Sequence, residues 1–161
     1  MNNLFEFIKV DSFLDDINRE DCFDTQDMDG ISPNYKILLA SECATDINNC
    51  IDDDDGSLIT PYNAETDTGV NLVESEGDED GLVSLLWSKG INGERTMSVA
   101  DSIVSYDFGV NTVQVKGAFL VSVTNGSGYV IAYSINNKTV EIDNTFLSPV
   151  TGMIWSMRYD E

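Results

Sequence analysis

The side chains best suited to chemistry in this sequence are carboxylates that cluster beside glycines. Such clusters are typical of calcium-binding loops, which need oxygen ligands at positions 1, 3 and 5, a glycine at position 6 and a bidentate Glu at position 12. Placing Gly81 at position 6 puts acids at the first three ligand positions, but position 12 is then Trp87. The loops centred on Gly30 and Gly56 also fail at position 12. We therefore expect solvated acidic loops and no metal site.

Histidine, the commonest general base, is absent from the chain. Its absence excludes Ser/His/Asp and Cys/His arrangements. A carboxylate pair could in principle hydrolyse a glycoside, but with 29 acidic residues no particular pair is singled out. The NGSGY segment at 125–129 enters an expected strand, and it lacks the helix and the Lys-Ser/Thr pair of a phosphate-binding loop. The sequence therefore predicts a protein that is not an enzyme, with no catalytic residue and no cofactor.

The three cysteines, Cys22, Cys43 and Cys50, all lie in the acidic half of the chain. Their number is odd, they form no CxxC motif, and no histidine is present to complete a metal site with them. We expect reduced thiols with a structural role.

Aromatic residues in the second half of the chain suggest one binding function. Tyr129, Tyr133, Trp155 and Tyr159 fall in expected strands, where they could together line a sugar-binding face. Aromatic side chains in strands more often pack in the core or against a neighbouring strand. Core packing is therefore the favoured interpretation, and carbohydrate binding is kept as an alternative.

Negative charge is concentrated in the first half of the chain. The formal net charge is −21, and 22 of the 29 acidic residues lie in residues 1–81 with only Lys9, Arg19 and Lys36 to offset them. This half must stay solvated or face a cationic partner. Direct binding to nucleic acid is disfavoured, because no basic patch is present. No apolar stretch is long enough to span a membrane, and the start of the chain has no secretory signal pattern, so we expect no membrane partner and synthesis in a cytoplasm.

Few regular elements are expected in residues 1–81. LFEFIKV near the start predicts a short strand, and Ser12 is a weak signal for the start of a short helix. Gly30 and Pro33 should break the chain before an apolar strand at 35–40. The stretch 43–81 predicts long acidic loops with one or two short strands, such as 70–73, and loops of this length usually serve an interaction.

Residues 82–161 show the alternation of antiparallel strands. Strands are expected at 82–87, 113–123, 129–135, 139–143 and 153–159, with a strand or helix in 97–108. In the second of these, Val113, Val115, Phe119, Val121 and Val123 should share one face, and Gly117 predicts a bulge or a close backbone approach. Asn125–Gly128 predicts a hairpin turn, and Asn136–Asn137 predicts a second tight turn.

These elements predict an all-β protein. We expect residues 82–161 to form an antiparallel meander that completes a single β-sandwich or small barrel, with residues 1–81 adding short strands, long acidic loops and at most one or two short helices.

Two segments carry a family resemblance. VQVKGAFLVSVTNGSGYVIAYSI and the C-terminal DNTFLSPVTGMIWSMRYD resemble the end of small virion structural proteins of tailed bacteriophages, of the crAss-like, Bacteroidetes-infecting type. The resemblance implies a capsid auxiliary or decoration protein, or a component of the head-to-tail connector. It also implies assembly in the host cytoplasm into a virion, with capsid, portal or tail subunits and other copies of the chain as partners. It carries over no catalytic or ligand-binding residue.

Two other functions stay open besides the virion protein. The acidic first half would suit a DNA-mimic inhibitor of host nucleases, although mimicry needs regularly spaced carboxylates on rigid elements. The aromatic residues would suit a carbohydrate-binding β-sandwich.

Overall fold

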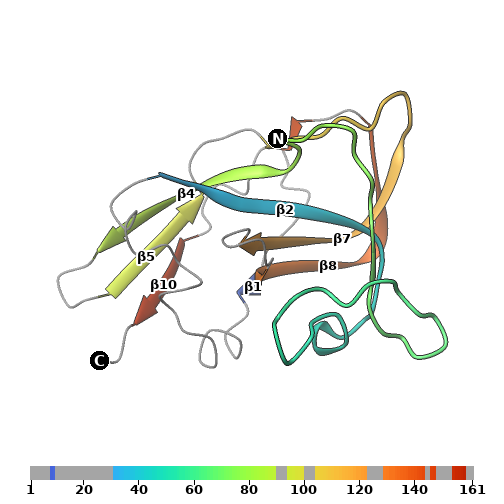
Figure 1. Cartoon of the computed structure of the whole chain (residues 1–161), viewed down its shortest axis with the longest axis horizontal. Helices are drawn as coiled ribbons and strands as arrows, with labels where there is room; N and C mark the ends of the chain where they lie inside the picture. The colour runs from blue at the N-terminus through green and yellow to red at the C-terminus, as the bar shows by residue number, and fades with distance from the viewer. Residues whose placement is uncertain are drawn as a thin grey trace.

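A computed structural model describes residues 8–9, 31–89, 94–99, 104–122, 129–143, 146–147 and 154–158, with side chains described within 35–83, 104–121, 130–136 and 138–143. Most of these residues lie in antiparallel strands (Figure 1). The helix found among them is η2, a three-residue 3-10 helix at Ile47–Asn49. The all-β prediction is confirmed. The helix expected after Ser12 lies outside the described residues.

Among the described residues, eight strands form one open sheet, and two more form a small separate sheet. The large sheet has the order β1-β8-β7-β2-β4-β5-β10, with β3 also paired to β2, and the small sheet pairs β6 with β9. The strands are β1 (Ile8–Lys9), β2 (Ile31–Cys43), β3 (Val70–Leu72), β4 (Leu82–Lys89), β5 (Glu94–Val99), β6 (Val104–Ser105), β7 (Val113–Ser122), β8 (Tyr129–Ile142), β9 (Phe146–Leu147) and β10 (Ile154–Arg158).

Strand β2 lies in the middle of the large sheet, between β7 and β4. Its Tyr35 pairs with Ser122 of β7 on one side and with Val83 of β4 on the other. This position follows from the apolar run at 35–40, because alternate residues of β2 enter hydrophobic clusters on both faces of the sheet. The strands of residues 82–161 therefore do not form one uninterrupted meander. Strand β2 separates β7 from β4, and β10 pairs with β5 at the far end of the sheet from β8.

Pro33 lies inside β2, so the expectation that it breaks the chain there is wrong. The pairing of β2 with β4 shifts register between Ser32 and Tyr35. Two residues of β2 oppose a single residue of β4 in this interval, which is a β-bulge. Proline is tolerated at a bulge because its missing N–H interrupts no regular ladder there.

Strand β8 continues through Asn136–Asn137 without reversing, so the second tight turn expected there is also wrong. Both halves of β8 pair with β7, and the partners that flank the irregularity are Ile135 with Gly117 and Val140 with Val115. Lys116 alone therefore faces residues 136–139, which form a large bulge in β8. The chain keeps its direction because β7 supplies a pairing edge on both sides of this bulge.

The irregularity beside Gly117 confirms the bulge expected there and changes which side chains share a face. Val115 packs in the same cluster as Leu120, whereas Phe119 belongs to the other cluster. The expectation that Val115 and Phe119 share a face is therefore wrong. A second register shift in the β7–β8 pair lies between Leu120 and Val121. Ile131 of β8 packs in the same cluster as Leu120.

The large sheet carries a hydrophobic cluster on each face. The first face is covered by residues 104–108, and its cluster includes Ile37, Leu39, Val83, Val104, Tyr106, Phe108, Leu120 and Ile131. The second face is covered by residues 44–69, which we call the 44–69 loop, and its cluster includes Ala40, Cys43, Ala44, Cys50, Ile51, Val70, Phe119 and Val130. Figure 1 shows this loop at the end of β2, beyond the β7–β8 pair.

Candidate functional site

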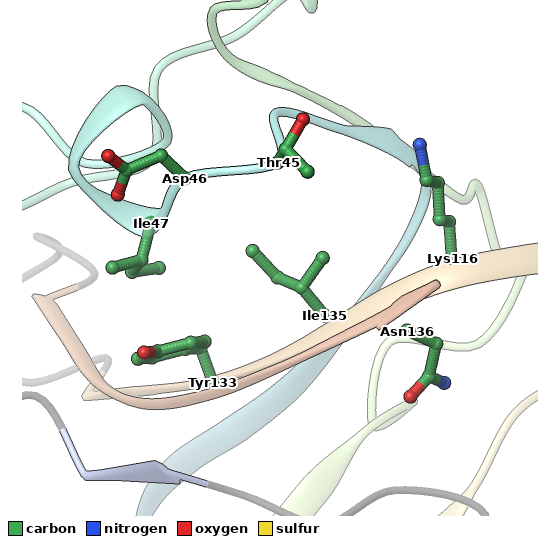
Figure 2. Close-up of a pocket in the computed structure, with 7 residues that line it drawn as sticks. All are labelled: Thr45, Asp46, Ile47, Lys116, Tyr133, Ile135 and Asn136. Atoms are coloured by element: carbon green, nitrogen blue, oxygen red, sulfur yellow. The ribbon is translucent and has the colours of Figure 1, made fainter. Parts of the chain in front are cut away.

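A cavity of about 410 Å³ lies where the 44–69 loop meets the bulge in β8. Its size falls within the range of small-molecule binding sites. We call it the bulge pocket, and its lining residues are Thr45, Asp46, Ile47, Lys116, Tyr133, Ile135 and Asn136 (Figure 2).

The register shift between β7 and β8 shapes the strand side of the pocket. Bulges redirect side chains and are common beside binding sites. Here, Lys116 of β7 and Ile135 of β8 both project toward the 44–69 loop (Figure 2). Gly117 allows a close approach at this point, because a Cβ there would lie 3.1 Å from Cys43 Sγ and 3.4 Å from Ser134 O. The bulge also leaves Asn136 Nδ2 buried with no hydrogen-bond partner among the described residues, an unfavourable feature of the kind found at functional sites.

Apolar side chains form the inner surface of the pocket. Figure 2 shows Ile47, Tyr133 and Ile135 pointing toward one another from the loop and from β8. All three pack against the cluster of the second face but remain partly exposed. The pocket therefore offers an apolar surface with an aromatic ring to anything that enters it.

Hydrogen bonds fix the loop side of the pocket. The Thr45 hydroxyl donates to Asp67 Oδ2 at 2.8 Å, and the Tyr62 hydroxyl donates to Asp67 Oδ1 at 3.2 Å. The Thr45 hydrogen bond is the main cause of the lowered pKa of Asp67, to which Lys116 contributes through its charge. Asp46 Oδ1 accepts from the backbone N–H of Asn48 and so caps η2. Both carboxylates are therefore held in place by hydrogen bonds.

The 44–69 loop is ordered by its own backbone hydrogen bonds although it has few regular elements. Ala44 N donates to Gly69 O at 3.0 Å, and Gly69 N donates to Asn49 O at 2.8 Å. Val130 N of β8 donates to Gly56 O at 3.1 Å, which ties the loop to the sheet. The expected strand at 70–73 is present as β3. The long acidic stretch is thus a fixed surface feature of the protein over these residues.

Two of the three cysteines support this loop. The Cys50 thiol lies 3.5 Å from Asp46 O and 3.7 Å from Ala44 O, both within hydrogen-bonding distance. Burial raises the pKa of Cys50 to about 12 and also raises the pKa of Cys43. Both are free thiols, as predicted, and both are protonated at neutral pH, so neither is an activated nucleophile. Cys22 lies outside the described residues.

The acidic residues beside glycines act as caps of turns. Asp52 Oδ1 accepts from Asp54 N at 2.8 Å. Asp80 Oδ2 accepts from Gly77 N at 2.9 Å and from Asp107 N at 3.0 Å. In the part of the chain that the structure describes, no three metal-ligating side chains of the His, Cys, Asp and Glu types gather closely enough to hold an ion.

The four aromatic residues considered for sugar binding do not share one surface. Tyr133 lines the bulge pocket. Trp155 lies on β10, whereas Tyr133 lies on β8. Four strands of the sheet lie between these two, namely β7, β2, β4 and β5. The side chain of Tyr129 and the whole of Tyr159 lie outside the described residues. Tyr133 is therefore the member of this set that the structure places at a pocket.

Most of the pocket could not be found from the sequence. Tyr133 and the bulge at Gly117 were the signals present, whereas Thr45, Asp46 and Ile47 reach the site only through the path of the loop. The pocket combines an apolar surface with one ammonium group, one carboxylate and hydroxyl groups, and these groups suit binding.

Within the described residues, no helix has the length and apolar character that a membrane span requires. Comparisons of the chain with protein-family models, curated proteins and solved structures find no match.

Proposed function

We propose that this protein is a non-catalytic structural subunit of a tailed-bacteriophage virion, either a capsid auxiliary or decoration protein or a component of the head-to-tail connector. The proposal starts from the resemblance carried by the segments that form β7, β8 and β10. The partners would be capsid, portal or tail subunits and other copies of the chain.

The observation that carries the proposal is the rigid display of acidic residues. Asp53, Asp54 and Asp55 are exposed on the 44–69 loop, and the loop is held by its own backbone hydrogen bonds and by Gly56 O, which accepts from β8. A surface that is already ordered loses little conformational entropy on binding. Concentrated negative charge also guides association with a cationic patch and opposes contact with DNA. These properties suit a subunit that must find one place on a protein lattice beside packaged DNA.

Mass spectrometry of particles purified from the phage that encodes the chain tests the proposal. We expect the protein in a fixed copy number relative to the major capsid or portal protein. Absence from the particles, together with recovery of a host nuclease on the purified chain, would instead support the DNA-mimic alternative.

A charge-reversal variant tests the role of the acidic surface. Asp53→Lys changes an exposed residue of the loop and removes no capping hydrogen bond that the structure shows, and Glu141→Lys makes the same change on exposed β8. We expect Asp53→Lys to reduce incorporation into particles more than Glu141→Lys does. Equal incorporation of the two variants would contradict a role for the loop in assembly.

A further inference from the structure

The bulge pocket has one charged group for which the described residues supply no hydrogen bond. The Lys116 ammonium group projects beside Thr45 at the edge of the pocket (Figure 2), and among the described residues no hydrogen bond to it is seen. It can only donate hydrogen bonds. The Asp46 carboxylate does not face it, because Asp46 Oδ1 accepts from Asn48 N at 3.0 Å and from Asn48 Nδ2 at 3.1 Å, and Figure 2 shows this side chain turned toward η2. A ligand that satisfies Lys116 must therefore be able to accept a hydrogen bond.

Charge narrows the class of ligand further. An anion would suit Lys116 but would meet Asp46 and Asp67 in a protein of net charge −21. A cation would suit the carboxylates but would be repelled by Lys116. Hydroxyl oxygens accept hydrogen bonds and carry no net charge, so a neutral molecule with several hydroxyls satisfies Lys116 without a charge penalty.

The inner surface of the pocket specifies the rest of the ligand. Ile47, Tyr133 and Ile135 face one another there, and the tyrosine provides an aromatic ring face. A sugar ring has one face formed mainly by C–H groups, which packs on an aromatic ring, and hydroxyls around its edge. The volume of about 410 Å³ accommodates a ligand of this size.

We propose that the bulge pocket binds a neutral saccharide, with a sugar ring packed on Tyr133 and a hydroxyl oxygen that accepts a hydrogen bond from Lys116. This site goes beyond the proposed structural role and does not depend on it. The sequence suggested a sugar-binding face of four aromatic residues, whereas the site proposed here is a single pocket formed by β7, β8 and the 44–69 loop.

Ligand-observed NMR with the full-length chain tests the proposal. The probes are glucose, galactose, mannose and N-acetylglucosamine, with acetate as the anion and glycine as the zwitterion. We expect saturation transfer to at least one neutral sugar and none to acetate or glycine. Transfer to acetate or glycine alone would overturn the proposal, as would no transfer to any sugar at millimolar concentration.

Three variants locate the binding. Lys116→Met removes the donor and Tyr133→Leu removes the ring, and each should weaken the sugar's affinity by about tenfold or more. Lys138→Met makes the same charge change at an exposed position of β8 that does not line the pocket. It should leave the affinity for the sugar unchanged. Circular dichroism and thermal melts check that each variant folds. Folded Lys116→Met protein that binds as tightly as Lys138→Met would overturn the proposal, whatever the outcome of the particle experiments.

Discussion

The two faces of the large sheet are covered in different ways. On the first face, residues 104–108 place Val104, Tyr106 and Phe108 in the core, and the two rings stack with centroids 5.6 Å apart and planes 9° from parallel. On the second face, the 44–69 loop buries Ala44, Cys50 and Ile51, and its other apolar side chains at Ile47, Leu58 and Tyr62 are only partly buried. Residues 104–108 therefore close the first face, whereas the 44–69 loop leaves the bulge pocket on the second.

The comparison shows how one sheet supports both a core and a binding site. The central strands β2, β7 and β8 supply side chains to both faces, so the sheet itself does not determine which face is closed. The segment that packs over each face determines whether that face is closed, together with the bulge opposite Lys116. Substitutions on the first face should therefore act on stability, and those around the pocket should act mainly on binding.

The largest difference should come from shortening an apolar side chain on each face. Leu120 is fully buried on the first face, and Leu120→Ala should lower the free energy of unfolding by about 3 kcal/mol through lost burial and the cavity left behind. Ile135 is only partly buried, so Ile135→Ala should lower it by about 1 kcal/mol. Urea denaturation measures both. Equal losses would mean that the pocket face is packed as tightly as the first face.

Substitution of a glycine by alanine should lower the free energy of unfolding by different amounts in the segments that cover the two faces. Gly69, in the 44–69 loop, has φ +95°, and a Cβ there would lie 2.7 Å from Pro61 O and 2.8 Å from Ile59 O. Gly69→Ala should lower the free energy of unfolding by about 2–3 kcal/mol, because it combines a disfavoured φ with contacts that backbone atoms cannot relieve.

Gly109 provides the matched control beside the first cover. Its φ is +64°, but the nearest atom to an added Cβ is Glu76 Oε1 at 3.2 Å, which belongs to a movable side chain. Gly109→Ala should therefore lower stability by only about 1 kcal/mol. Denaturation of the two variants side by side isolates the backbone contacts. A loss for Gly109→Ala as large as that for Gly69→Ala would show that φ alone matters.

Alkaline pH should weaken the second cover through Cys50. Burial raises the pKa of its thiol from 9.0 to about 12, so the folded state holds this proton more tightly than the unfolded state. The stabilisation is complete below pH 9 and is lost as pH rises from 9 toward 12, with a slope of at most about 1.4 kcal/mol per pH unit. Cys50→Ala should reduce the slope of unfolding free energy against pH between 9 and 11. An unchanged slope would place the titration on other groups.

The sequence predicted the strands better than their arrangement. Alternation and turn residues located β4, β7, β10 and the first half of β8, because these signals are local. The central place of β2 depends on pairing with strands distant in the chain, and no local pattern encodes it. Asn136–Asn137 suits a tight turn, but continued pairing with β7 outweighed that preference.

The pocket was predictable only in part for the same reason. Gly117 marked the bulge because a missing side chain is visible in the sequence. Tyr133 was noted as an aromatic strand residue. Lys116 became notable only once the register shift left it alone opposite four residues, and Asp46 only once the Cys50 thiol and the Gly69 backbone fixed the loop above it.

The smallest expected difference concerns one hydroxyl group under each cover. Tyr106 is buried and its hydroxyl donates to Ile37 O at 2.7 Å, so Tyr106→Phe leaves a buried carbonyl short of a partner and should lower the free energy of unfolding by about 1–2 kcal/mol. Tyr62→Phe removes a hydrogen bond to Asp67 at the edge of the pocket, where water can replace it, so its loss should be smaller. Thermal denaturation at neutral pH compares the two. If Tyr62→Phe loses as much stability as Tyr106→Phe, water does not reach the second cover, and a site closed to water in this way would also exclude the sugar hydroxyls that the pocket is proposed to bind.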